Sequence, residues 1–158
     1  MDGYLVYGGK CGEDLIKLAE LPAKTTSYTI KNLKKGTYYK YQVKAFKIIN
    51  GEQVIIMTSK VVHSITEGKK YGNPIKVTTD IDSLKLEPGQ SKTVTGYEVL
   101  PKDKKLKEHT AAVRYESSNK EVATVNSKGK IVAKSTGSCY IYAYAQNGVF
   151  KRIKVTVD

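Results

Sequence analysis

The side chains in this sequence that could do catalytic or metal chemistry are few and far apart. Its two histidines, His63 and His109, fall in what we predict to be separate modules, so we expect no shared metal site or general base. The sequence has no G-x-S-x-G elbow, H-E-x-x-H helix, phosphate-binding loop or C-x-x-C pair. We therefore predict that the chain is not an enzyme and that it carries no cofactor and no metal site.

The two cysteines and one pair of aspartates were considered as candidate disulfide and calcium-binding residues. Cys11 lies in the turn-like GGKCGED, whereas Cys139 lies on the apolar face of a predicted strand near the other end of the chain. A disulfide framework is not expected from two cysteines in separate modules. Asp80 and Asp82 form a D-x-D near the predicted module junction. Because calcium needs several oxygen ligands, we favour loop solvation for this pair and keep calcium binding as the alternative.

Tyrosine is the residue type that offers a binding surface. In KKGTYYKYQVKAF, strand alternation predicts that Tyr39, Tyr41, Val43 and Ala45 face the core and that Tyr38 faces solvent. We therefore interpret most of this cluster as scaffold and keep Tyr38 as a candidate ligand contact.

A second tyrosine cluster lies in SCYIYAYAQ. Alternation predicts an outward row of Tyr140, Tyr142 and Tyr144, spaced by roughly 6.5 to 7 Å, and an inward set of Cys139, Ile141, Ala143 and Ala145. Such rings stack on sugar faces or anchor a protein partner, because tyrosine combines a rigid apolar ring with a hydrogen-bonding tip. The alternative is cross-strand packing on an exposed sheet. The adjoining predicted strand carries Lys151, Arg152 and Lys154, which would make the same sheet basic.

Charge and hydropathy narrow the class of partner. The formal net charge is +12, but Arg114 and Arg152 are the only arginines among 27 basic residues. Lysine keeps a surface soluble, whereas arginine supplies the planar fork that reads phosphates and bases, so we expect no specific nucleic-acid binding. The alternatives are a solvated basic surface and attraction to a polyanion such as an acidic wall polymer or glycan.

No apolar run approaches the roughly 18 residues of a membrane span, so we expect no membrane insertion by this segment.

Short strands between turn signals must position these residues. Strand patterns recur along the chain, including TSYTIKNL and AAVRYESSN, and helical periodicity hardly appears. EDLIKLAEL is interpreted as a strand and turn, and Asn50-Gly51 predicts a two-residue hairpin. EGKKYGNP has the composition of a linker. Without crossover helices the sheets should be antiparallel, so we predict an all-β chain of two tandem β-sandwiches.

Two family resemblances follow from these stretches. GYLVY, TSYTIKNLKKGTYYKYQVKAF, the Asn-Gly pair and TSKVV resemble a fibronectin type III domain, which we place at residues 1–66. LKLEPGQSKTV, VRYESSNKEVATVNSKGKIVAKSTGSCYIYAYAQNG and IKVTV resemble a group 2 bacterial immunoglobulin-like domain, which we place at residues 74–158, with a linker at 67–73.

The fibronectin type III resemblance implies a structural role for Tyr39 and a first sandwich that is shorter than the family's. Tyr39 would be the tyrosine corner, whose hydroxyl bonds back to the preceding turn. GYLVY resembles the third strand of a fibronectin type III domain, so the first sandwich would lack its first two strands. An uncovered core face and unpaired edges favour association. We therefore predict a homodimer through the truncated first module, or its completion by a neighbouring chain.

The resemblances also imply a function. We expect a non-catalytic adhesion or spacer module pair of a bacterial protein that is extracellular or at the cell surface. The alternative is a carbohydrate- or cell-wall-binding accessory module of an extracellular enzyme. Candidate partners are a surface polysaccharide, a wall polymer or a host protein. Fold alone does not decide among them.

Overall fold

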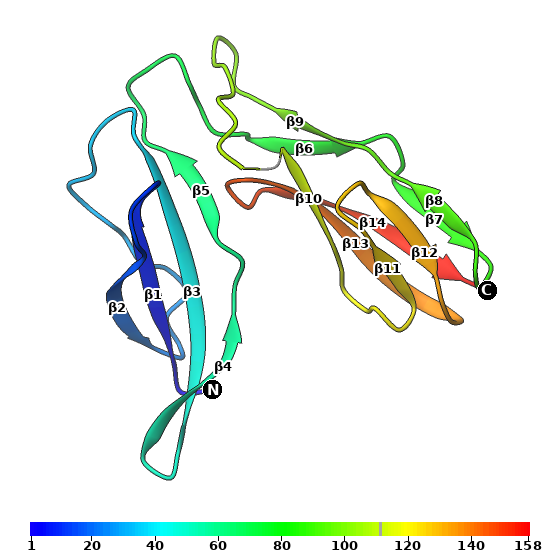
Figure 1. Cartoon of the computed structure of the whole chain (residues 1–158), viewed down its shortest axis with the longest axis horizontal. Helices are drawn as coiled ribbons and strands as arrows, with labels where there is room; N and C mark the ends of the chain where they lie inside the picture. The colour runs from blue at the N-terminus through cyan, green and yellow to red at the C-terminus, as the bar shows by residue number, and fades with distance from the viewer. Residues whose placement is uncertain (111) are drawn as a thin grey trace. The chain divides into compact units, whose positions relative to one another are not determined.

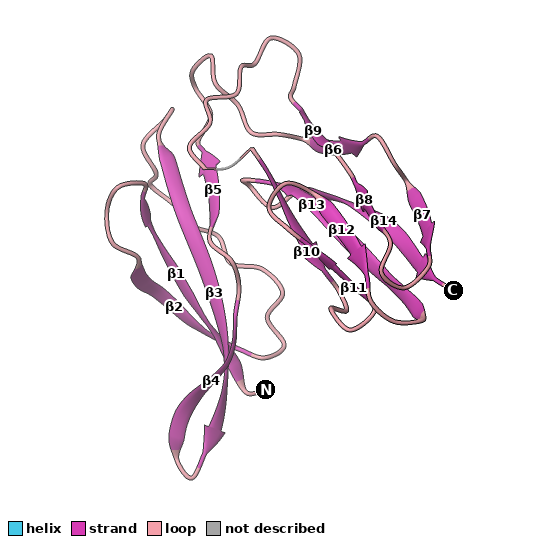
Figure 2. Ribbon diagram, turned by 45° about the vertical axis from the view of Figure 1, so that its right-hand side comes forward, coloured by secondary structure: helices cyan, strands magenta, loops and turns pink. Residues whose placement is uncertain are grey.

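The computed structural model describes residues 1–110 and 112–158, and within them the chain forms strands and loops but no helix (Figure 2). An all-β fold is therefore confirmed. Accordingly, none of the described residues forms a long apolar helix of the kind that crosses a bilayer. Ala111, the first residue of the expected strand AAVRYESSN, lies outside the described residues. The chain divides into two compact units, unit 1 at Met1–Tyr71 and unit 2 at Gly72–Asp158.

Unit 1 is built on one antiparallel sheet in which the strands run in the order β2-β1-β3-β4, with β5 also paired to β3 (Figure 1). The strands are β1 (Gly3–Lys10), β2 (Ile16–Pro22), β3 (Tyr38–Ile49), β4 (Glu52–Thr58) and β5 (Val62–Ile65). The expected strand within EDLIKLAEL is thus confirmed as β2.

The predicted hairpin at Asn50-Gly51 is also confirmed. Both residues have positive φ, 53° and 84°, and Ile49 pairs with Glu52 directly across the turn. This is the conformation that a two-residue turn needs to match the twist of its strands. The long β3–β4 hairpin therefore follows from local sequence.

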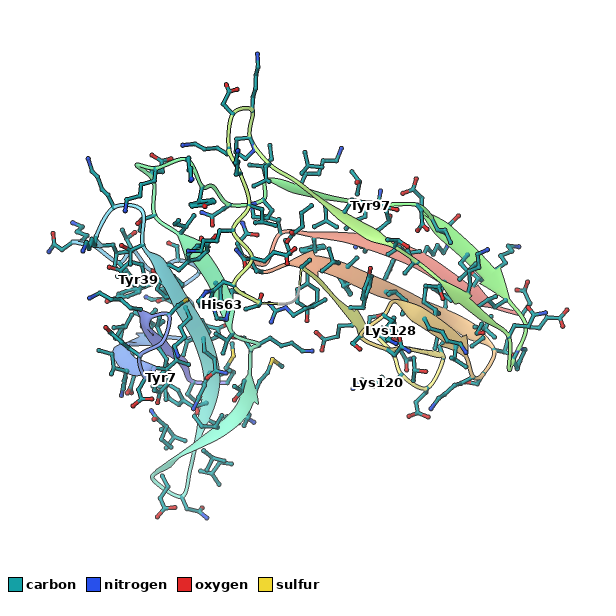
Figure 3. The ribbon with its side chains drawn as sticks, turned by 45° about the horizontal axis from the view of Figure 1, so that its top comes forward. Tyr7, Tyr39, His63, Tyr97, Lys120 and Lys128 are labelled. Atoms are coloured by element: carbon teal, nitrogen blue, oxygen red, sulfur yellow. The ribbon has the colours of Figure 1, made fainter. Side chains whose placement is uncertain are left out.

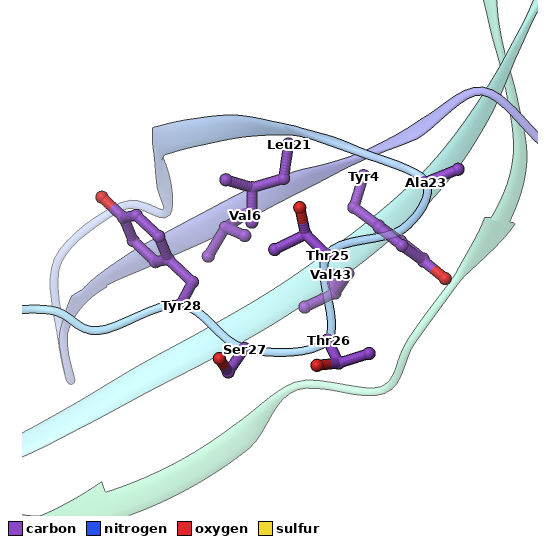
Figure 4. Close-up of a pocket in the computed structure, with 9 residues that line it drawn as sticks. All are labelled: Tyr4, Val6, Leu21, Ala23, Thr25, Thr26, Ser27, Tyr28 and Val43. Carbon is purple, nitrogen blue, oxygen red and sulfur yellow. The ribbon is translucent and has the colours of Figure 1, made fainter.

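Two expectations for unit 1 are wrong. TSYTIKNL is not a strand: residues 25–30 have no regular secondary structure. Val43, expected in the core, is 38% exposed. Both errors have the same cause, because burial and strand formation each need a second layer. Among the described residues of unit 1, only the irregular segment 23–33 lies over this sheet face, and it neither pairs with a strand nor fills the space (Figure 4).

The described residues of unit 2 form nine strands in three small sheets. The largest has the order β10-β13-β14-β7, the second β11-β12-β8, and the third pairs β6 with β9. The strands are β6 (Lys76–Thr79), β7 (Ser83–Leu86), β8 (Ser91–Thr93), β9 (Gly96–Val99), β10 (Val113–Ser117), β11 (Ala123–Val125), β12 (Lys130–Ala133), β13 (Gly137–Ala145) and β14 (Phe150–Val157). The pairing of β14 with β7 is parallel, a departure from the expected antiparallel sheets.

Strict alternation on β13 organises the core of unit 2. The expected inward set is confirmed as buried: Cys139, Ile141, Ala143 and Ala145 are at most 4% exposed. They pack with Ile131 from β12 and with alternate residues of β14, namely Ile153, Val155 and Val157. Small residues on β13 let the sheets approach, and branched residues fill the space between them. The opposite face of β13 must therefore point away from the core.

Tyr115 extends this core from β10. Its ring packs against the buried cluster, and its hydroxyl accepts a hydrogen bond from the backbone N–H of Gly96 at 2.8 Å. A half-buried hydroxyl with a partner avoids the cost of burying an unpaired polar group. The phenol therefore ties β10 to the start of β9.

Candidate functional site

The outer face of the β10-β13-β14 sheet gathers the aromatic and arginine side chains of unit 2. Because Ile141 and Ala143 point inward, Tyr140, Tyr142 and Tyr144 point outward from β13. The strand register adds neighbours from both sides: Arg114 lies opposite Tyr144, Arg152 opposite Tyr142, and Phe150 opposite Tyr144. We call these six residues the aromatic face: Arg114, Tyr140, Tyr142, Tyr144, Phe150 and Arg152.

Both arginines of the chain hold a tyrosine ring at an end of this row. The guanidinium carbon of Arg152 is 4.8 Å from the centre of the Tyr140 ring, and that of Arg114 is 5.0 Å from the Tyr144 ring. Each contact contributes roughly 0.5–1 kcal/mol at an exposed site, more when desolvated. The arginines therefore fix the outer tyrosines against the sheet.

The middle of the row is held by aromatic packing. Tyr142 meets Phe150 edge-to-face, with 5.4 Å between ring centres and 66° between the planes. Phe150 is nevertheless 58% exposed. This is the offset arrangement that ring quadrupoles favour. An exposed phenylalanine held in a fixed orientation gives the face an apolar centre.

The charges on the face are unevenly distributed. At the Tyr140 end, Arg152 and Lys154 are both exposed, and Lys154 lies directly opposite Tyr140. At the other end, the hydroxyl of Tyr144 donates to the carboxylate of Glu116 at 3.2 Å, and the arginine there is half-buried. The Tyr140 end is therefore the cationic one.

Lys151 does not belong to this face, although its strand is the expected one. It pairs with inward-facing Ala143 in the register, and its Nζ lies 2.9 Å from Oδ1 of Asp82. Asp80 has a partner as well, since its Oδ1 accepts a hydrogen bond from the N–H of Thr95 at 2.8 Å. In unit 2 the two aspartates thus act as structural acceptors.

The chemistry available here is recognition. The guanidinium of Arg152 is stacked on a ring and still exposed, so its N–H groups can bind a carboxylate, phosphate or sulfate. Arg152 lies over one face of the Tyr140 ring, so that face is not open for a sugar to stack on. The aromatic face therefore suits an anionic group beside an apolar surface better than a neutral sugar.

Tyr38 and Tyr39 occupy different environments in unit 1. Tyr38 is half-buried at the start of β3 and pairs with Ile65 of β5. Tyr39 is 7% exposed, and its hydroxyl accepts a hydrogen bond from the backbone N–H of Lys34 at 3.0 Å (Figure 3). That bond ties β3 to the loop before it, as the hydroxyl of a tyrosine corner does.

Replacing Tyr39 with phenylalanine is expected to destabilise unit 1 by about 1 kcal/mol, because the N–H of Lys34 loses its partner while the ring is kept. Urea unfolding measures this difference. Tyr28→Phe is the matched control: Tyr28 is 45% exposed, so its loss should change stability by less than about 0.5 kcal/mol. Equal effects of the two substitutions would contradict the role given to the Tyr39 hydroxyl.

A thiol and an imidazole lie side by side in unit 1. Sγ of Cys11 is 3.2 Å from Nδ1 of His63, beside Lys40 on the same sheet face. Burial raises the pKa of the Cys11 thiol, and the charge of Lys40 lowers it by less. Burial likewise raises the pKa of the Cys139 thiol. Both thiols are therefore mainly protonated at neutral pH, which disfavours nucleophilic chemistry.

Grooves open on the sheet face where Val43 is exposed. Two of them, with volumes of about 380 Å³ and 520 Å³, share Val6, Tyr28 and Val43 as lining residues. The first runs past Tyr4 and Leu21, and Figure 4 shows Tyr28 and Val6 along its wall. Their lining is apolar or hydroxyl-bearing, with no ionisable group other than tyrosine, so they offer no acid–base chemistry.

Comparison with known families decides the class of unit 2. The model of the bacterial Ig-like domain (group 2) matches residues 74–157. The chain belongs to this family. The aromatic face thus lies on the main sheet of a bacterial Ig-like domain.

Solved structures include a distant likeness to this chain. The structure titled "Structure of surface layer protein SbsC, domains 1-6" is similar over 98% of this chain, at 17% identity and a TM-score of 0.42. This bacterial Ig-like chain covers 20% of the length of that chain. No curated protein matches the sequence.

Most residues of the aromatic face could be predicted from the sequence, but two could not. The tyrosines were recognisable from alternation along β13, and Arg152 from its place on the adjoining strand. Phe150 and Arg114 were not, because their place depends on the register of β14 and β10 against β13. Cross-strand neighbours are fixed by register, which composition does not determine.

Proposed function

We propose that the chain is a non-catalytic module pair of a bacterial extracellular or cell-surface protein and that it binds an anionic surface polymer through the aromatic face. Membership of the bacterial Ig-like family supports the module class and the surface location. Unit 1 is then the fibronectin type III-like partner, a proposal supported by its five-stranded sheet and by the Tyr39–Lys34 hydrogen bond.

The observation that carries the binding proposal is the exposed guanidinium of Arg152 held over the Tyr140 ring. A side chain fixed in this way loses little conformational freedom when it binds. Lys154 adds a second exposed cation next to it, and Phe150 adds an apolar surface along the row. A polymer with repeated carboxylate, phosphate or sulfate groups along a partly apolar backbone fits this combination.

A spacer role is the second candidate, and it makes a different prediction. In a spacer the aromatic face only stabilises the sheet, and the +12 charge attracts any polyanion without regard to which cation is removed. Adhesion through the aromatic face requires instead that Arg152 contribute more than any other single exposed cation.

The test measures affinity for an acidic polysaccharide, with a neutral polysaccharide beside it, over a range of salt concentrations. Arg152→Gln should weaken binding to the acidic polymer about tenfold, because it removes a charge-assisted contact worth about 1.5 kcal/mol. Tyr140→Leu should weaken it as well, because the guanidinium loses its platform. Neither variant should alter the fold, since both side chains lie outside the core.

Two matched controls separate the face from bulk charge. Lys128→Gln removes one exposed cation in the turn between β11 and β12, and Tyr97→Leu removes a tyrosine that is 55% exposed on β9 (Figure 3). Each should change the affinity by less than about twofold. If Lys128→Gln weakens binding as much as Arg152→Gln, the attraction is nonspecific and the spacer role is correct.

A further inference from the structure

The thiol and the imidazole that lie side by side in unit 1 are placed there by two ladders of the same sheet. Cys11 directly follows β1, and its N–H donates to the carbonyl of Tyr38 at 3.0 Å, which continues the β1–β3 pairing by one residue. His63 lies on β5 opposite Lys40 of β3 (Figure 3). Residues opposite each other in a ladder share a sheet face, and so do residues two apart on one strand. Cys11 and His63 therefore reach over β3 from its two sides.

The two side chains have the geometry of a metal-chelating pair. Sγ of Cys11 is 3.2 Å from Nδ1 of His63, so one proton lies between two metal-binding atoms, whichever ring tautomer is present. An ion bonded to both atoms at roughly 2.0–2.3 Å would fit between them with an angle of about 90–100° at the ion. Rotation of the Cys11 side chain widens this angle. Both residues are only half-buried, so an ion can reach them from solvent.

The number and kind of ligands select the ion. Thiolate sulfur is a soft ligand and imidazole a borderline one, and this combination suits copper and zinc better than calcium or magnesium. No carboxylate oxygen from the described residues of unit 1 lies within 4.8 Å of both atoms. Zn²⁺ sites use three or four protein ligands. Two such ligands without an oxygen fit Cu⁺ better, because this ion accepts coordination numbers of two and three.

Charge also favours a monovalent ion. Lys40 shares the sheet face, and its ammonium group acts electrostatically on Cys11. A thiolate and Cu⁺ together form a neutral unit, whereas a thiolate and Zn²⁺ keep a positive charge. That charge would be repelled by Lys40 and by a chain whose net charge is +12. The surroundings therefore penalise a divalent ion more than a monovalent one.

We propose that Cys11 and His63 bind one Cu⁺ ion. On binding, the thiol releases its proton to solvent and its sulfur donates as a thiolate, while Nδ1 of the neutral imidazole donates its lone pair. The copper stays monovalent, so no oxidant or reductant takes part. The sequence predicted no metal site, because the two residues are 52 positions apart and belong to no ligand motif. The site lies in unit 1 and does not depend on polymer binding by the aromatic face.

Competition with a colorimetric Cu⁺ chelator, under reducing and oxygen-free conditions, tests the site. The full chain should take one Cu⁺ from the chelator. Cys11→Ser should lose this binding although the buried thiol of Cys139 remains, and His63→Gln should lose most of it. Met57→Leu is the matched control, because it removes a soft thioether that is 70% exposed on the same sheet, and it should bind as the wild type does. A wild type that binds no Cu⁺, or undiminished binding after either ligand substitution, would overturn the proposal.

A second measurement reports on the ligand atom itself. Cu⁺ is diamagnetic, so the ring nitrogen signals of ¹⁵N-labelled chain can be followed as the ion is added. The Nδ1 signal of His63 should shift in the wild type and stay in place in Cys11→Ser, whose unchanged amide spectrum would show that it is folded. Zn²⁺ should produce the shift only at higher concentration. A shift that Zn²⁺ produces at lower concentration than Cu⁺, or that persists in Cys11→Ser, would overturn the assignment.

Discussion

Truncation of Ile141 to alanine is expected to destabilise unit 2 by about 3–4 kcal/mol, near the upper end of what a single core substitution costs. Ile141 lies at the centre of β13 and is 0% exposed. Its neighbours come from three strands that cannot close together without breaking their ladders, so most of the cavity would remain. Urea unfolding of the full chain, followed through amide signals of unit 2, measures the loss.

The control for this prediction is Ile75→Ala. Ile75 has the same side chain in the same unit but is 61% exposed, so its truncation should cost less than about 0.5 kcal/mol. Similar losses from both substitutions would mean that β13 is not the centre of the core. The aromatic face would then lose its structural basis, since it depends on Ile141 and Ala143 pointing inward.

Gly129→Ala should destabilise unit 2 by about 3 kcal/mol for two separate reasons, a left-handed backbone and a steric clash. Gly129 has φ +78° in the turn between β11 and β12, where its N–H donates to the carbonyl of Asn126 at 3.0 Å. An added Cβ would lie 2.1 Å from the carbonyl oxygen of Val94. That oxygen belongs to buried backbone, so it has little freedom to move.

Gly89→Ala separates the two reasons. Gly89 also has positive φ, +87°, but a Cβ there would meet no atom within 4 Å. Gly89→Ala should therefore lower the free energy of unfolding by only about 1 kcal/mol, the cost of placing alanine in a left-handed backbone conformation. Thermal or urea unfolding of both variants gives the comparison, and the difference of about 2 kcal/mol is the contribution of the clash. Equal losses of stability in the two variants would show that the Val94 carbonyl moves aside at little cost, and would contradict the predicted clash.

The sequence predicted the parts of the fold that local chemistry determines. Asn50-Gly51 gave the β3–β4 turn because both residues tolerate positive φ. The alternation of β13 predicted which of its residues are buried, because a shift of one residue would place its tyrosines in the core. In each case a single strand or turn carried the whole signal.

The errors arose where the outcome depends on a second element. Residues 25–30 have a strand pattern but no regular structure, and Val43 has an inward position but is exposed. The cause is the same for both, because the described residues of unit 1 form no second sheet over that face. Lys151 was placed with Arg152 and Lys154 although it lies one residue out of phase with them. The parallel pairing of β7 with β14 likewise depends on chain topology, which turn signals do not report.

The candidate binding site was also only partly predictable from the sequence, for the same reason. Composition indicated that two arginines among 27 basic residues were too few to read nucleic acid. It did not indicate that each of the two would hold a tyrosine ring on one sheet face. A cation–π pair across strands depends on strand register. Composition therefore does not show which of the 27 basic residues lies over an aromatic ring, whereas the structure does.

Titration of ¹⁵N-labelled chain with a soluble acidic oligosaccharide, followed by amide chemical shifts, tests the binding proposal most directly. The account predicts that the largest shifts cluster on β13 and β14 around Tyr140, Arg152 and Lys154, and that Arg152→Gln removes them. Neither Lys120 nor Lys128, both exposed on the loops flanking β11, should respond comparably (Figure 3). Shifts spread evenly over the exposed lysines, or centred on those loops, would contradict it.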